Sequence, residues 1–213
     1  MLIKITFLYD NDAWDKRLRA DWGFAALVEA FGRTILFDTG AGPKILLHNM
    51  KLLGISPGCI DEIFISHDHW DHTGGLREIL GYKAVPVYVP DTMQHAGRIP
   101  GAVAVQSGRE IAENIHSTGT LKNIEQSLCI VRDGNVTVIA GCSHPGVGTI
   151  LSAASQLGRP RALVGGLHGF SDFQVLSGLD LVCATHCTRH KEKIRSQFPQ
   201  TAVAGGAGRV LQI

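Results

Sequence analysis

An apolar stretch that leads directly into a cluster of histidines and aspartates is the feature that most constrains this chain. Residues 63–65 are apolar, and the following segment 67–72 holds three histidines and two aspartates within six residues. Imidazoles and carboxylates packed so densely would repel one another when charged, and would leave polar atoms unpaired when neutral, unless a divalent cation took up their lone pairs. The segment therefore predicts a metal site, and a solvated polar loop is the alternative.

The order of the residues in this segment predicts two cations. Alternate side chains at the end of a strand point the same way, so His67 and His69 can bind one cation. The turn after Trp70 would direct Asp71 and His72 towards a second cation.

Three further apolar runs lead to histidines. Residues 136–141 precede His144, residues 161–167 precede His168, and residues 179–185 precede His186. Ligands in layered α/β folds gather at the carboxyl ends of strands, where distant segments converge. We therefore expect these histidines and the 67–72 segment to share one cleft, although any one of them alone would more often be an ordinary surface or core residue.

Length, charge and cysteine usage bound the class of protein. The 213 residues fit one domain over 1–213. A net charge of +1 gives no electrostatic footprint for nucleic acid or an anionic membrane, so we expect the partner to be a small-molecule substrate, and we expect that substrate to be anionic. We leave the oligomeric state open. Five scattered cysteines form no disulfide framework and no CxxC pair, which favours a reducing cytoplasm. We expect neither a signal peptide nor a membrane-spanning segment.

Periodicity predicts an α/β (α+β) fold with a sheet in each half. Strands are expected over 3–9, 24–30 and 34–37, a helix over 44–53, and a hairpin over 127–140. The segment 110–126 is expected to be a surface loop, and 91–95 to begin a short helix. Helices and strands then alternate to residue 198, and the tail 201–213 reads as two short strands. This pattern indicates a four-layer helix/sheet/sheet/helix sandwich with the site along one edge.

The segment 67–75 resembles the HxHxDH signature of the metallo-β-lactamase fold superfamily. Segments 36–40, 140–146, 164–168 and 184–188 are similar to the branch that contains dihydropterin-methyl-ribofuranosylaminobenzene-phosphate synthase. The resemblance spans nearly the whole chain and implies an αββα sandwich with a dinuclear metal site. Two departures affect the expected pocket: Leu167 stands where the branch has an aromatic residue, and Arg189 where it has glycine.

We assign the first cation to His67, His69 and His144, and the second to Asp71, His72 and His186. Asp71 is also expected to act in catalysis. Zinc suits these nitrogen and oxygen ligands, and manganese or iron would also accept them. Many superfamily members place a bridging aspartate where this chain has Gly141-Cys142, so the bridge is left open between water, a substrate oxygen and a carboxylate such as Glu125.

Four other residues or segments have open roles. Asp38 would accept the second N–H of a ligating histidine, or would simply form a turn. His168 is expected to donate a proton or to contact substrate, with metal ligation and a structural role as alternatives. Cys142 would be a ligand, a nucleophile or, as we favour, a small buried apolar residue. The loop 11–23 would contact an anionic, ring-bearing substrate or be an exposed charged loop.

These expectations point to a metal-dependent enzyme that acts on a phosphorylated or ester-type small molecule, and the branch resemblance favours pterin-related phosphate chemistry. The dinuclear centre would activate water or stabilise a leaving group. An iron-based oxidoreductase on the same fold, or a non-catalytic metal-binding module, is the alternative.

Overall fold

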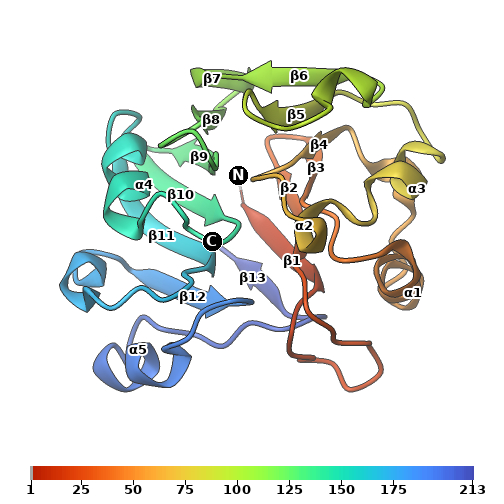
Figure 1. Ribbon diagram of the computed structural model, residues 1–213. Coiled ribbons are helices and arrows are strands. Elements are labelled where there is room, and N and C mark those ends of the chain that lie inside the picture. Colours follow the sequence, from red (N-terminus) through yellow and green to blue (C-terminus); the bar gives the residue numbers. More distant parts are fainter. Residues whose placement is uncertain (1) are drawn as a thin grey trace.

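The computed structural model describes residues 2–213, and its strands form two sheets that pack face to face (Figure 1). The first sheet contains β1 (Lys4–Tyr9), β2 (Ala25–Ala30), β3 (Arg33–Phe37), β4 (Glu62–Phe64), β5 (Val87–Pro90), β6 (Ala102–Val105) and β13 (Val210–Gln212). The second contains β7 (Ser107–Ala112), β8 (Ile115–Gly119), β9 (Leu128–Arg132), β10 (Asn135–Ala140), β11 (Arg159–Gly166) and β12 (Leu181–Thr185). Their spatial orders within the described residues are β13-β1-β2-β3-β4-β5-β6 and β12-β11-β10-β9-β8-β7.

Helices cover the outer face of each sheet. On the first sheet these are α1 (Pro43–Leu52) and α3 (Leu76–Leu80), and on the second they are α4 (Val147–Ala154) and α5 (Lys191–Gln197). The short α2 (Trp70–Thr73) lies inside the histidine-rich segment, and single 3-10 turns occur at η1 (Pro57–Cys59), η2 (Ala96–Arg98) and η3 (Phe173–Leu176). The arrangement is the predicted αββα sandwich.

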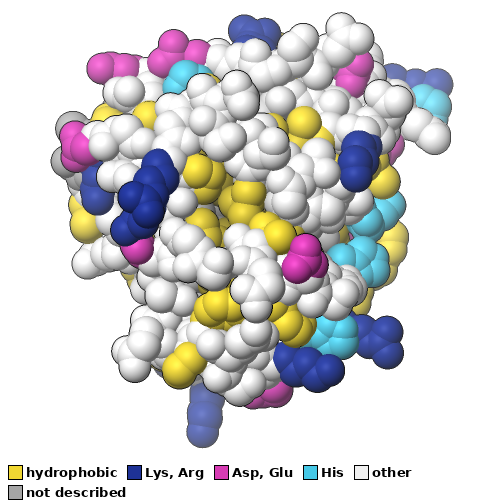
Figure 2. All heavy atoms as spheres, turned by 90° about the vertical axis from the view of Figure 1, so that its left-hand side faces the viewer, with side chains coloured by type: hydrophobic (Ala, Val, Ile, Leu, Met, Phe, Trp, Pro, Cys, Tyr) yellow, Lys and Arg dark blue, Asp and Glu magenta, His cyan; other side chains and the backbone are white. Residues whose placement is uncertain are grey.

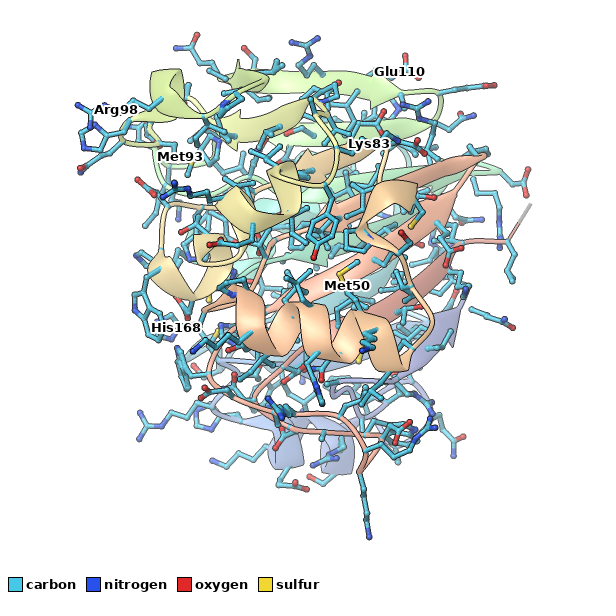
Figure 3. All side chains as sticks on the ribbon, turned by 90° about the vertical axis from the view of Figure 1, so that its right-hand side faces the viewer. Met50, Lys83, Met93, Arg98, Glu110 and His168 are labelled. Atoms are coloured by element: carbon cyan, nitrogen blue, oxygen red, sulfur yellow. The ribbon has the colours of Figure 1, made fainter. Side chains whose placement is uncertain are left out.

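In the central strands, successive apolar residues point to opposite sides, so each sheet has two buried faces. In β2, Ala26 and Val28 pack against the other sheet, whereas Ala25 and Leu27 pack under the helices of the first sheet. Met50 is fully buried and points from α1 into the same layer (Figure 3). The core between the sheets draws on residues from Ile3 to Leu211, so both ends of the chain contribute to it.

Strand direction is what positions the site. Strands β3, β4 and β5 run parallel in the first sheet, and β10, β11 and β12 run parallel in the second. The carboxyl ends of parallel neighbours lie at the same edge of a sheet, so the loops that follow these strands come together.

Three local expectations were wrong. Most of the segment 110–126 belongs to the antiparallel strands β7 and β8 and the turn after them, and is not a surface loop. The sequence of β8 does not show the apolar alternation of a strand, because one of its inward positions is Ser117. The hydroxyl of Ser117 is buried and donates to Gln126 Oε1 at 2.7 Å. The described helical turn in the next region is η2, after residues 91–95, and the tail contributes one named strand, β13.

On the face covered by α4, the described residues form no large patch of one charge (Figure 2). Lysines, arginines and acidic side chains are scattered there among uncharged groups (Figure 2). Within residues 2–213, no helix is both long enough and apolar enough to cross a membrane.

Candidate metal centre

The structure brings all six predicted ligands together at the carboxyl ends of strands from both sheets. The donor atoms of His67, His69 and His144 lie within 4.8 Å of one another, and so do those of Asp71, His72 and His186. We call these the first set and the second set. Their rings are adjacent, since the His67 and His72 ring centroids are 4.2 Å apart.

The spacings within the sets match those around a single cation. Ligands at about 2.0–2.1 Å from a tetrahedral zinc ion lie about 3.3 Å from each other. Asp71 Oδ2 lies 3.5 Å from His186 Nε2 and 3.8 Å from His72 Nε2. In the first set, His67 Nε2 lies 2.9 Å from His69 Nδ1. Each set can therefore surround one ion after small adjustments.

Two buried nitrogens in these sets have no protein partner. Among the described residues, His144 Nε2 and His186 Nε2 are buried without a hydrogen bond. Leaving such an atom unpaired costs free energy, and a neutral imidazole nitrogen is a good ligand for a divalent cation. The donor set and these two atoms fit a metal centre.

The carboxylate of Asp38 holds two histidines of the sets in the form that binds metal. His72 Nδ1 lies 2.7 Å from Asp38 Oδ2, so it carries the proton and leaves Nε2 free. The Ser66 hydroxyl donates to the same oxygen at 2.7 Å and therefore accepts from His67 Nδ1 at 2.9 Å. The role of Asp38 as partner of a histidine, one of the two alternatives above, is thus confirmed.

The loop after β1 supports the second set. His186 Nδ1 lies 2.9 Å from Asn11 Oδ1, an acceptor, which leaves His186 Nε2 unprotonated. Trp22 donates its indole N–H to Asp71 Oδ2 at 2.7 Å, and its ring lies 5.4 Å from the His186 ring. The side chain of Trp22 is half exposed, so it also forms part of the site's rim.

Glu125 holds the backbone of the loop that carries His144. Its Oε1 accepts the backbone N–H groups of Gly141, Cys142 and Ser143 at 3.0–3.1 Å, and its Oε2 accepts that of His144 at 2.8 Å. Both oxygens are thus engaged, and the suggestion that Glu125 bridges two cations is wrong.

Gly141 is required where this loop passes the first set. A Cβ at this position would lie 2.1 Å from Ser66 Oγ and 3.1 Å from His67 Nδ1. The absence of a side chain lets the loop approach the hydrogen bond that orients His67.

Cys142 is buried, as expected for a small apolar residue, but it also lies close to the ligand atoms. Its sulfur lies 3.3 Å from His72 Nε2, and its side chain is buried. Its hydrogen bond with Cys187 and its burial raise the pKa of the thiol above the ordinary value in the absence of a cation.

His168 lies at the rim of the site, next to His144. Its ring is 5.1 Å from the His144 ring, its side chain is exposed, and Figure 3 shows it at the edge of the molecule. Its backbone φ of 46° is left-handed, an uncommon conformation for a residue other than glycine. It belongs to neither ligand set within the described residues.

His67, His72 and His144 are held neutral. Burial first, and then the neighbouring histidines, lower the pKa of His67 and His72 below the ordinary value and that of His144 to about 4. Burial raises the pKa of Asp71, but the adjacent rings of His186 and His72, 3.5 and 3.8 Å from its Oδ2, outweigh burial and the net shift is downward. Neutral imidazoles and an ionised carboxylate are the protonation states that bind cations.

Sequence reasoning missed Asn11 and Ser66, and it assigned Trp22 no specific contact. Asn11 and Trp22 belong to the loop 11–23, whose aromatic and charged residues were the available signal. Ser66 directly precedes His67 but gives no signal of its own, because its role depends on Asp38, 28 residues away.

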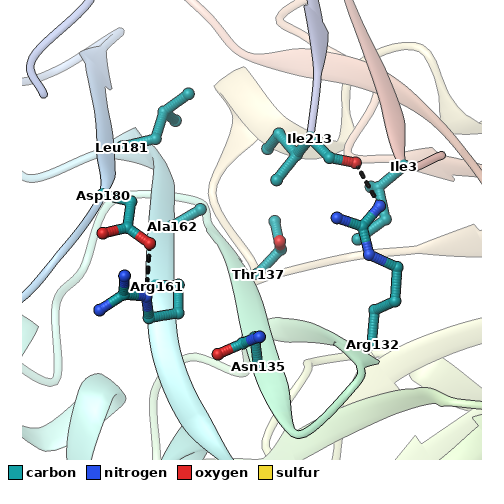
Figure 4. Close-up of a pocket in the computed structure, with 9 residues that line it drawn as sticks. All are labelled: Ile3, Arg132, Asn135, Thr137, Arg161, Ala162, Asp180, Leu181 and Ile213. Atoms are coloured by element: carbon teal, nitrogen blue, oxygen red, sulfur yellow. Dashed lines mark hydrogen bonds and ion pairs between the residues drawn. The ribbon is translucent and has the colours of Figure 1, made fainter.

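A separate cavity of about 140 Å³ lies at the opposite edge of the second sheet, where β10, β11 and β12 begin (Figure 4). Arg161 forms an ion pair there with Asp180, and Arg132 donates to the Ile213 carbonyl oxygen at 2.7 Å. None of the predicted ligands lines this cavity.

Comparison with known families identifies the superfamily to which the chain belongs. The family model described as "Metallo-beta-lactamase superfamily" matches residues 23–148, which include the histidine-rich segment and His144. The chain belongs to the metallo-beta-lactamase superfamily. The fold and the resemblance predicted from the sequence are both confirmed.

Individual proteins are similar to this chain over most or all of its length. The 7,8-dihydropterin-6-methyl-4-(beta-D-ribofuranosyl)-aminobenzene-5'-phosphate synthase of Methanocaldococcus jannaschii is 24% identical, over 96% of this chain and 92% of the relative. A solved metal-dependent hydrolase of the beta-lactamase superfamily superposes with a TM-score of 0.83 at 23% identity, over 99% of both chains. A diphosphatase from the PhnP family superposes with a TM-score of 0.62 at 15% identity, over 100% of this chain and 98% of the other.

Proposed function

We propose that this protein is an enzyme that uses two divalent cations, zinc in the first instance, to act on a phosphorylated or ester-type small molecule. The observation that carries the proposal is the pair of buried, unpartnered nitrogens, His144 Nε2 and His186 Nε2, one in each of two adjacent ligand sets. A structural metal site would favour a closed, cysteine-rich tetrahedron, whereas each set here supplies three side chains and leaves a position open.

Each set would bind one cation. His67, His69 and His144 would hold the first cation, and Asp71, His72 and His186 the second. When bound, two such ions polarise a phosphoryl or carbonyl oxygen and lower the pKa of water, which is the chemistry that hydrolysis needs.

The residues around the sets keep the ligands aligned. Asp38, Ser66 and Asn11 fix which nitrogen of each partner histidine carries the proton. Trp22 holds the Asp71 oxygen that faces His72 and His186. Ligands fixed in this way need no reorganisation when the reaction begins.

His168 is suited to the leaving group. It stands at the exposed rim beside His144 and outside both sets, so its ring can reach a substrate bound over the first set. In this proposal it donates a proton to the departing oxygen or a hydrogen bond to a phosphate.

The substrate class rests on chemistry and likeness together. Trp22, half exposed and in contact with Asp71 and His186, and the exposed Trp70, which precedes Asp71 in the sequence, offer surfaces for a ring-bearing molecule. The M. jannaschii relative is named for a pterin-containing phosphate. We therefore include pterin-type phosphates among the proposed substrates. The proposed compartment is the cytoplasm.

The test is a screen of zinc-loaded protein against phosphodiesters, lactones, thioesters and pterin pyrophosphates. We expect turnover of at least one phosphate or ester that His69→Gln abolishes and that His48→Gln, on the distant helix α1, leaves unchanged. Metal analysis with an optical spectrum of freshly purified protein accompanies the screen. Iron with an oxidoreductase-type absorption, or two bound zinc ions without any turnover, would contradict the proposal.

A further inference from the structure

We propose that the Cys142 thiolate is a ligand of the second cation, on the side where the two ligand sets meet. The inference rests on the proposed function, because it requires a second cation at Asp71, His72 and His186.

The position of the sulfur carries the inference. Cys142 Sγ lies 3.3 Å from His72 Nε2, the nitrogen that Asp38 leaves free for a cation. Its sulfur also lies within 4.8 Å of the donor atoms of His67, in the first set, and of His186, in the second. A sulfur that is close to ligand atoms of both sets lies between the two cations.

Hydrogen bonds hold the backbone of the loop that carries Cys142. Glu125 binds the N–H groups of residues 141–144, including that of Cys142 at 3.1 Å. Gly141 packs directly against Ser66, and Ser143 takes a left-handed φ of 58°. The loop therefore cannot move the Cys142 backbone away from the ligands without breaking several hydrogen bonds.

The chemistry of the second set leaves room for a fourth donor. Asp71, His72 and His186 supply one oxygen and two nitrogens, so a thiolate would complete four donors there and the open position for substrate would lie at the first set. Zinc accepts a thiolate at about 2.3 Å as a fourth ligand, and soft sulfur ligands favour zinc or iron over magnesium and manganese. Binding would replace the S–H bond by a sulfur–metal bond and release the proton to solvent.

Cys187 offers a matched comparison. Its sulfur lies within 4.8 Å of Cys142 Sγ and of a His186 nitrogen, but it is partly exposed and no set of the described residues joins it to His67 or His72. Its thiol points at the Cys142 carbonyl oxygen at 4.0 Å. We therefore assign ligation to Cys142 and a packing role to Cys187.

Cobalt(II) substitution tests the assignment without relying on activity. Protein reconstituted with two cobalt ions per chain is expected to show a sulfur-to-cobalt charge-transfer band in the near ultraviolet. Cys142→Ser should lose the band and bind the second ion about tenfold more weakly or worse, the scale of losing even an outer partner of a ligand. Cys187→Ser should keep the band. Cys142→Asp should hold two cobalt ions without the band, which guards against a folding defect in the serine variant.

Two results would overturn the inference while leaving the proposed function intact. One is wild-type protein with two cobalt ions and no charge-transfer band, and the other is a band that survives in Cys142→Ser but disappears in Cys187→Ser. Binding of fewer than two cobalt ions by the wild type would instead overturn the dinuclear site itself, and the inference with it.

Discussion

Replacing Asp38 by asparagine should weaken metal binding although Asp38 touches no cation in the proposed site. Asp38 Oδ1 accepts the Ser66 backbone N–H at 2.7 Å, and Oδ2 accepts from His72 Nδ1 and the Ser66 hydroxyl at 2.7 Å each. The amide oxygen of an asparagine must take the Oδ1 position, because a backbone N–H cannot become an acceptor. Its NH₂ group would then face His72 Nδ1.

This arrangement would move the proton on His72. Nδ1 would have to accept, so the proton would sit on Nε2, the nitrogen that the second cation needs. The Ser66 hydroxyl would also turn to donate to His67 Nδ1, with the same consequence for the first set. Loss of such an outer partner costs about 10–100-fold in metal affinity, or about 1.4–2.7 kcal/mol.

The fold itself should tolerate the change. Burial raises the pKa of Asp38 well above its ordinary value, so a neutral amide removes an unfavourable buried charge. The backbone φ of 54° is one that asparagine adopts more readily than most residues. Circular dichroism of the metal-free variant should therefore show an intact fold.

The assay is a competitive zinc titration against a chelating dye, with Asp68→Asn as the control. Asp68 lies in the same motif but is exposed, and among the described residues it accepts only from the Gln94 backbone N–H, at 2.9 Å. Asp38→Asn with wild-type affinity for both ions would refute the argument that the proton position on His72 controls binding.

Three further predictions concern the surroundings of the site. Trp22→Phe keeps a ring beside His186 but loses the 2.7 Å bond to Asp71, so turnover should fall about tenfold with metal retained, whereas Trp14→Phe, at a ring that faces Arg209, should change neither. His168→Ala should keep its metal and lose roughly 10²-fold in rate, whereas His144→Ala should lose metal as well; loss of one metal equivalent from His168→Ala would make that residue a ligand. Burial raises the pKa of Asp10 to about 6, above its ordinary 3.8, so the stability it contributes is present below pH 3.8 and is lost as the pH rises through 6. Urea unfolding of the metal-free protein should show this loss in the free energy of unfolding, at most about 3 kcal/mol, and Asp10→Asn should lack it. If the free energies of unfolding of the wild type and Asp10→Asn change in parallel with pH, Asp10 is not the group responsible.

The sequence predicted the fold where apolar residues alternate regularly. The strands that lead to His67, His144 and His186 were recognised because their apolar runs are long enough to indicate buried strands. The hairpin β7–β8 was not, since its buried positions include Ser117, whose hydroxyl is satisfied by a side chain that sequence alone does not bring near.

The candidate ligands could be predicted from the sequence, whereas most of the residues that contact and orient them could not. Histidines and aspartates at strand ends carry a chemical signature that is local in sequence. Asn11 has no such signature, because its role arises from a contact with His186, 175 residues away. For Cys142 the sequence left three roles open, and its contact with His72, 70 residues away, is visible only in the fold. Only folding brings these atoms into contact.

The central claim is that this site holds two cations, and anomalous X-ray diffraction from zinc-loaded crystals at the zinc edge tests it most directly. We expect two anomalous peaks per chain roughly 3.5–4 Å apart. One peak should be bounded by His67, His69 and His144, and the other by Asp71, His72 and His186. A single peak, or zinc bound elsewhere while these six side chains remain free, would contradict the account.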